Sequence, residues 1–103
     1  MEPANLGSDC RYELLGHSPS GNLVIEPYLM AHRCAAGPYA TDHHAGVKFI
    51  YLLSGLVRYR YGERVVGLAR GDSLLFEADV LHGVESVAAG PVEYLSATFA
   101  LRP

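Results

Sequence analysis

The sequence lacks several features that would point to a particular class of protein. It contains no tryptophan, and Lys48 is its single lysine, so every other cation among the eight Lys+Arg residues is arginine. No apolar run approaches the roughly 20 residues of a membrane-spanning helix, and residues 1–9 lack the apolar centre of a signal peptide. We therefore expect a cytoplasmic protein that makes no contact with a membrane.

Cysteine and positive charge are also scarce. Cys10 and Cys34 lie far apart without the spacing of a metal site, so we expect two free thiols in a reducing compartment. The formal net charge of −3 gives no reason to expect contact with nucleic acid. Four arginines lie close together in the sequence, and we expect them to form a solvated face: Arg58, Arg60, Arg64 and Arg70.

The chain is rich in turn residues and in short β-type segments. Half of its 103 residues are hydrophobic, which is enough for the core of one domain. We expect residues 1–10 to form a flexible lead-in and residues 11–101 to form that domain. No segment shows a helical period with caps at both ends. Strands are predicted over residues 11–15, 22–33, 47–53, 56–61, 64–68, 73–76, 80–87 and 92–101.

Closely spaced short strands predict an antiparallel sandwich or barrel. The clearest alternation places Val57, Tyr59 and Tyr61 on one face and the arginines between them on the other. Pro27 has no backbone donor, so it marks an edge or a bulge in its strand. Gly55 is expected to form a turn or a bulge between two strands.

Residues 42–55, with the sequence DHHAGVKFIYLLSG, concentrate the side chains that carry chemistry. His43 and His44 follow an acid and precede a short apolar run, which closes on Gly55. Lys48 stands near the start of that run. A group of residues suited to a metal is therefore followed closely by a cation.

With these residues at this spacing, the chain resembles a cupin, an all-β jelly-roll barrel also described as a double-stranded β-helix. The family's first motif runs through two histidines to a glutamate and, six residues later, a glycine; residues 44–55 fit its spacing. The second motif starts at Gly-Asp and carries a histidine near its end, as residues 71–82 do (GDSLLFEADVLH). The N-terminal part further resembles the cupin half of helix-turn-helix transcription regulators, a layout shared with a mononuclear-iron epoxidase.

The resemblance implies a metal site of two or three histidines and one glutamate, a set suited to Fe, Mn, Ni or Zn. His44 and His82 match ligand positions. Lys48 stands where the glutamate is expected, Asp42 stands where the first histidine is expected, and His43 is one residue out of register. The expected cofactor is therefore either none or one such divalent metal, held by His44, His82 and Asp42.

Lys48 decides between these alternatives. If its strand alternates inward at residues 48, 50 and 52, the ammonium enters the barrel beside His44 and His82, where it would repel a divalent cation. Burial would also lower its pKa. Three roles stay open: a contact for an anionic ligand such as a carboxylate or phosphate, a desolvated nucleophile or base, and a structural role. In the structural role it would pair with an acid such as Glu93 or extend out of the barrel mouth into solvent.

Two further features concern binding. Tyr59 and Tyr61 share the face expected to line the barrel, as ordinary core or as a pocket wall whose hydroxyls orient a ligand. On the opposite face of the buried strand, Phe49, Tyr51 and Leu53 form a surface that is more apolar than one small barrel needs. That surface is a candidate for homodimer packing.

The sequence favours a non-catalytic domain that binds a small molecule, preferably an anion, as in the sensor half of a transcription regulator. The residues expected around that ligand are His44, Lys48, Tyr59, Tyr61 and His82. The alternative is a metal-dependent oxygenase or isomerase that uses His44, His82 and Asp42. A third class, a dimerisation module without a ligand, also stays open.

Overall fold

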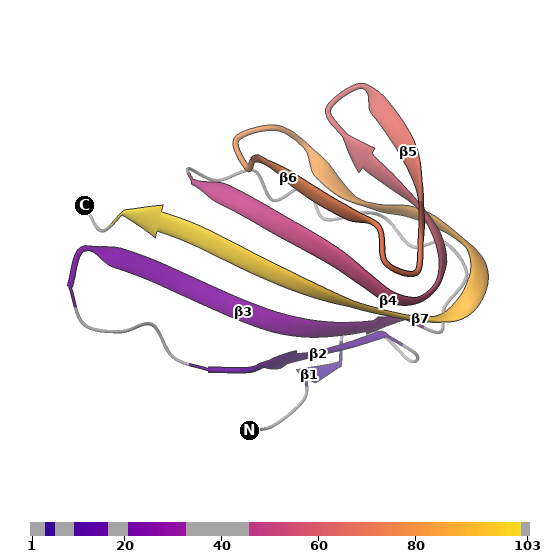
Figure 1. Ribbon diagram of the computed structural model, residues 1–103, viewed down its shortest axis with the longest axis horizontal. Coiled ribbons are helices and arrows are strands. Elements are labelled where there is room, and N and C mark those ends of the chain that lie inside the picture. The colour runs from indigo at the N-terminus through magenta and orange to yellow at the C-terminus, as the bar shows by residue number, and fades with distance from the viewer. Residues whose placement is uncertain (1–3, 6–9, 17–20, 33–45, 102–103) are drawn as a thin grey trace.

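The computed structural model describes residues 4–5, 10–16, 21–32 and 46–101, and none of these is helical. They form seven strands in one antiparallel sheet (Figure 1). The all-β architecture predicted from the sequence is confirmed. The strands are β1 (Ala4–Asn5), β2 (Cys10–Leu14), β3 (Leu23–His32), β4 (Val47–Tyr61), β5 (Arg64–Ala69), β6 (Ser73–Glu77) and β7 (His82–Leu101).

Two long strands, β4 and β7, bend the sheet over on itself. The first half of β4 pairs with β6 on one side and with the end of β7 on the other. The second half of β4 pairs with β5 and with the beginning of β7. The sheet thus continues from β1, β2 and β3 through β7 and β4, and then folds so that two layers enclose a core (Figure 1).

A bulge at Gly55 allows β4 to run as one bent strand. The pairing of β4 with β7 shifts register on both sides of this glycine, between Leu52 and Leu56. Gly55 has a φ of 85°, which favours glycine, and a Cβ there would lie 2.6 Å from Cγ2 of Val92. The sequence predicts a turn or a bulge between two strands here, and the structure shows the bulge.

The core lies between the layers and follows the predicted alternation. Four side chains of β4 are at most 2% exposed to solvent: Ile50, Leu52, Val57 and Tyr59. Val92 of β7 packs into the same cluster. Because β4 contributes side chains from both its halves, it positions Lys48, Tyr59 and Tyr61 of the candidate site that the next subsection describes.

Outside the core, the arginines of the predicted solvated face separate from one another. Arg58 and Arg70 are exposed. The guanidinium of Arg60 donates from Nε to Glu85 Oε2 at 2.8 Å and from a terminal nitrogen to Glu85 Oε1 at 3.0 Å, which links β4 to β7. Hydrogen bonding from Arg60 holds the pKa of Glu85 below its ordinary value. Arg64 is exposed as well, and it lines a groove described below.

The N-terminal strands extend the same sheet. β1 falls within the range predicted as a lead-in and pairs with β2. Pro27 lies in β3 without a shift of register against β7, so the predicted bulge is absent there. The carbonyl oxygen of Pro27 accepts a hydrogen bond from the amide of Leu15 at 2.8 Å, one residue beyond the end of β2. The amide proton that proline lacks would therefore fall where the pairing of β2 with β3 ends. No helix among the described residues could span a membrane.

Candidate functional site

The candidate site is built around a contact between Lys48 and His82. Lys48 lies near the start of β4, opposite Phe76 of β6 and Thr98 of β7, and shares the inward face of Ile50. Its Nζ is 3.1 Å from Nε2 of His82, the first residue of β7. The His82 side chain is completely buried, whereas Lys48 is half-buried.

The second nitrogen of His82 fixes the roles in this contact. Nδ1 is 2.8 Å from the backbone carbonyl oxygen of Val80, which can only accept, so Nδ1 carries a proton and donates it. In the neutral ring Nε2 is then the acceptor, and it receives a hydrogen bond from the Lys48 ammonium, since two protonated groups would repel each other. The pair accordingly brings one positive charge to the inner face of the barrel.

Aromatic rings enclose the histidine end of this pair. The ring of Phe76 lies 5.2 Å from that of His82, 6.0 Å from Tyr59 and 5.0 Å from Tyr61. Burial, with a smaller contribution from the nearby Tyr94, raises the pKa of Tyr59 well above its ordinary value, so its hydroxyl stays neutral. The surroundings of the charge are therefore apolar and uncharged on this side.

The structure brings only some of the predicted site residues together. Lys48 and His82 touch, the rings of Tyr59 and Tyr61 pack against Phe76, and Tyr61 pairs with His82 between β4 and β7. Glu93, the suggested acid partner of Lys48, is exposed on the opposite face of β7 from Val92 and Tyr94, so that pairing is wrong. The remaining predicted residues, Asp42, His43 and His44, lie outside the described residues.

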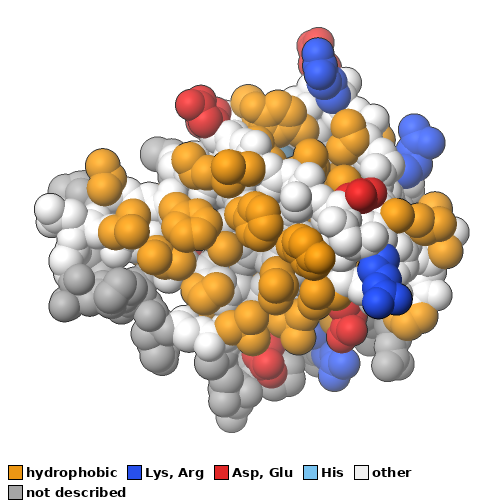
Figure 2. Space-filling model, in the orientation of Figure 1, with side chains coloured by type: hydrophobic (Ala, Val, Ile, Leu, Met, Phe, Trp, Pro, Cys, Tyr) orange, Lys and Arg blue, Asp and Glu red, His pale blue; other side chains and the backbone are white. Residues whose placement is uncertain are grey.

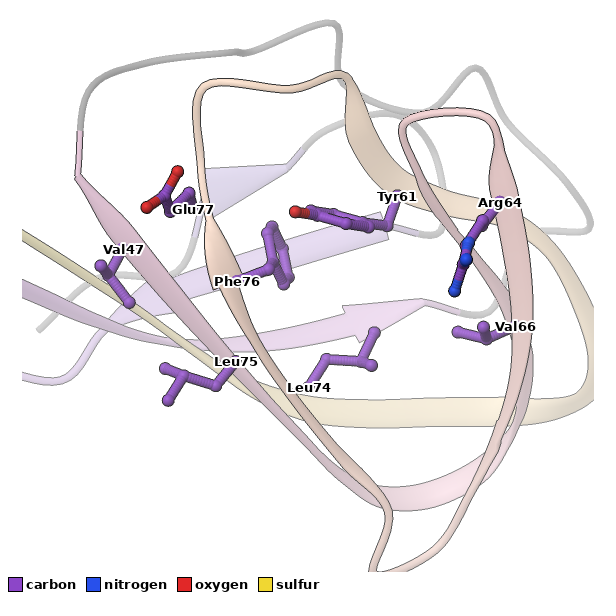
Figure 3. Close-up of a pocket in the computed structure, with 8 residues that line it drawn as sticks. All are labelled: Val47, Tyr61, Arg64, Val66, Leu74, Leu75, Phe76 and Glu77. Atoms are coloured by element: carbon purple, nitrogen blue, oxygen red, sulfur yellow. The ribbon is translucent and has the colours of Figure 1, made fainter.

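Sequence reasoning missed a groove beside this site, between β5 and β6 (Figure 3). Its volume is about 510 Å³, and Arg64 and Glu77 are its charged residues. The hairpin contains the signal that could have located Arg64: a turn at residues 62–63 pairs Arg64 directly with Tyr61, so both share the inward-facing side of the hairpin. The other lining residues are Val47, Val66, Leu74, Leu75 and Phe76.

Comparison with known proteins agrees with this fold. The cupin domain family matches residues 30–98, so the chain belongs to the cupin domain family and the predicted resemblance is confirmed. Comparison with curated protein sequences gives no match.

Among solved structures, the chain is similar to KdgF from Halomonas sp., with a TM-score of 0.71 and 12% identity over 95% of this chain and 86% of that one. Hydroxypropylphosphonic acid epoxidase from S. wedmorenis gives a TM-score of 0.72 and 19% identity, covering 94% of this chain and 53% of that one. An HTH_3 family transcriptional regulator from Vibrio cholerae gives 0.65 and 19%, covering 92% and 52%. At these identities the likeness shows the fold, and this chain spans about half of the last two proteins.

The described residues do not fit the metal that the family resemblance implies. A zinc ion on a histidine nitrogen would need to lie about 2.0–2.1 Å from it. Nε2 of His82 faces the Lys48 amine, and Nδ1 is bonded to the carbonyl of Val80, so both nitrogens are engaged. No cluster of three or more His, Cys, Asp or Glu side chains occurs in the part of the chain that the structure describes. Of the predicted ligands only His82 falls within it.

Proposed function

We propose that the protein binds a small anionic molecule inside the barrel, as a sensor-type cupin domain without catalytic activity. The observation that carries this proposal is the 3.1 Å contact between Lys48 Nζ and His82 Nε2. The pair places one positive charge beside a fully buried ring. Such a charge attracts a carboxylate or a phosphate and repels a divalent cation, and its effect is stronger at a half-buried position than at the surface.

The chemistry of the surrounding residues supports a binding role. Phe76, Tyr59 and Tyr61 give the histidine side of the site an apolar wall, against which the organic part of an anion would pack. The similarity of this fold to that of the HTH_3 family transcriptional regulator from Vibrio cholerae supports a sensor role in regulation. We therefore assign Lys48, and the predicted His44, His82, Tyr59 and Tyr61, to this ligand site.

A thermal-shift experiment with acetate, benzoate, oxalate and phosphate tests the proposal. We expect at least one of these anions to raise the melting temperature of the wild-type protein in a saturable manner. The shift should disappear in Lys48→Met, which keeps the length and apolar stem but removes the charge, and should be partly kept in Lys48→Arg. Arg70→Met is the matched control, because Arg70 is exposed in the turn before β6.

Elemental analysis separates this proposal from the metal-dependent oxygenase or isomerase. The protein purified without chelators should contain Fe, Mn, Ni and Zn only far below one equivalent. One equivalent of metal that is lost in His82→Ala, with no anion giving a thermal shift, would contradict the proposal and support the enzyme.

A further inference from the structure

We propose that the groove between β5 and β6 is a second ligand site, which binds a small monocarboxylate with an apolar body. This β5–β6 groove is separate from the Lys48–His82 pair. Its volume of about 510 Å³ lies within the range of pockets that hold small organic ligands, roughly 300–1,000 Å³.

Apolar side chains form most of the groove wall. Val66 of β5 lies below Arg64 at one end, Leu74 of β6 lies between the two ends, and Leu75, which is 69% exposed, forms part of the rim (Figure 3). Burying these side chains under an alkyl or aromatic body stabilises a complex by removing their apolar surface from water.

Arg64 gives the groove its selectivity for an anion. It lies at one end, near Val66, while Glu77 lies at the other end beside Val47 (Figure 3). Among the described residues, Arg64 forms no ion pair, in contrast to Arg60, which is paired with Glu85. A guanidinium binds a carboxylate through two parallel hydrogen bonds, so Arg64 fits the head of such a ligand.

The charges at the two ends favour one carboxylate over two. Glu77 would repel a second carboxylate at the far end of the ligand, whereas an apolar tail or a hydrogen-bond donor would be accepted there. The hydroxyl of Tyr61 points into the groove between the two ends and makes no hydrogen bond to any described residue, so it remains able to contact the ligand (Figure 3).

Phe76 and Tyr61 border both this groove and the interior site. The ring of Phe76 lies 5.0 Å from that of Tyr61, which lines the groove, and 5.2 Å from that of His82, which does not. A ligand held by Arg64 would therefore contact Phe76 and Tyr61 from the groove, whereas Lys48 and His82 are not among the residues that line it. Arg64 lines the groove and Lys48 does not, so substitutions at these two residues should separate the two sites.

Isothermal titration of the full chain with 3-phenylpropionate tests the proposal. We expect saturable binding that Arg64→Gln weakens by at least about tenfold, because a hydrogen-bonded charge contact is lost. Arg70→Gln should leave the affinity unchanged. The uncharged 3-phenylpropionamide should bind weakly and equally to the wild type and to Arg64→Gln.

Titration of Lys48→Met with 3-phenylpropionate shows whether the ligand binds in the groove or at the interior site. Binding of 3-phenylpropionate that persists in Lys48→Met and falls in Arg64→Gln supports the groove, whatever the fate of the interior site. Binding that is lost in Lys48→Met and unchanged in Arg64→Gln would overturn the groove and leave the proposed function standing. Absence of binding to the wild type, or Arg64-dependent self-association in place of binding, would also overturn it.

Discussion

Lys48 donates a hydrogen bond to Nε2 of His82, and this contact places a cation on the inner face of the barrel. Nδ1 of His82 is committed to the carbonyl of Val80, so Nε2 is the nitrogen left to face the amine. Exchanging the amine for a carboxylate would reverse the sign of the charge beside Nε2. The chemistry of the site therefore depends on one side chain, and changes at that side chain are its most informative tests.

Two buried tyrosines should ionise apart from the other tyrosines of the chain. Burial raises the pKa of Tyr59 and of Tyr94 well above the ordinary value of 10.0, with a smaller contribution from Tyr94 at Tyr59. The unfolded chain releases these protons near pH 10 and the folded chain keeps them, so the free energy of unfolding should fall as the pH rises above 10.

Near-ultraviolet absorbance and circular dichroism, recorded together during an alkaline titration, measure this effect. The tyrosinate absorbance of Tyr59 and Tyr94 should appear only as the protein unfolds. Tyr59→Phe should make the free energy of unfolding fall less steeply with alkaline pH. Joint ionisation of all seven tyrosines in a protein that remains folded would rule out the buried state of these two.

At the residue level, motif spacing was enough to select Lys48 and His82, whose contact the structure shows. Spacing could not place Arg64, because a charged residue beside a turn is usually solvated and only the pairing with Tyr61 reveals which way it faces. The sequence likewise could not show on which face of β7 Glu93 lies, because bulges in the pairing of β4 with β7 shift which side chains point inward.

Among the structural elements, β4 has the largest influence on the site, because its bend brings Lys48 and Tyr59 into one core. The bend depends on the bulge at Gly55, which is packed closely against β7. A Cβ at this position would lie 2.8 Å from the carbonyl oxygens of Ala89 and Pro91 and 2.6 Å from Val92 Cγ2. Backbone atoms cannot move aside as a flexible side chain would.

Gly55→Ala should therefore destabilise the protein by at least about 2 kcal/mol, through backbone strain and steric overlap. Urea unfolding followed by circular dichroism measures this change. Gly67→Ala on β5 is the matched control, because nothing lies within 4 Å of a Cβ there and its φ is not positive. A similar effect from both substitutions would show that the bulge does not need glycine.

The length of the elements was harder to predict than their existence. Residues 47–53 and 56–61 are expected as two strands, yet they form the single bent strand β4, and residues 82–101 of β7 combine two others in the same way. Gly55 and the Gly90-Pro91 pair resemble ordinary turns in the sequence. Long-range pairing between β4 and β7 keeps these positions inside strands, and local sequence does not report that pairing.

At the scale of the whole molecule, one sheet face remains largely apolar. Phe49 lies between Leu75 and Ala97, and Tyr51 lies next to Leu95 in the adjacent row. Figure 2 shows apolar side chains across the middle of one face of the molecule, with most charged side chains around them. The apolar face of one sheet packs well against another sheet face, and a second copy of the chain provides one.

We therefore expect a homodimer that forms through this face. Sedimentation velocity should give about twice the 11.1 kDa mass of one chain, and Tyr51→Glu should shift the protein to monomer. Leu56→Glu is the control, because Leu56 is also exposed but lies on the second half of β4. A wild-type monomer at every concentration, or equal disruption by both substitutions, would exclude this interface.

The most direct test of the central claim uses the fact that Lys48 is the only lysine of the chain. Protein made with isotope-labelled lysine gives one side-chain ammonium signal in a nuclear magnetic resonance spectrum, and that signal reports on the site without further assignment. We predict that benzoate or phosphate shifts it saturably, whereas chloride at equal ionic strength and zinc ions do not. A signal that stays fixed with every anion and shifts with one equivalent of zinc would contradict an anion site at Lys48.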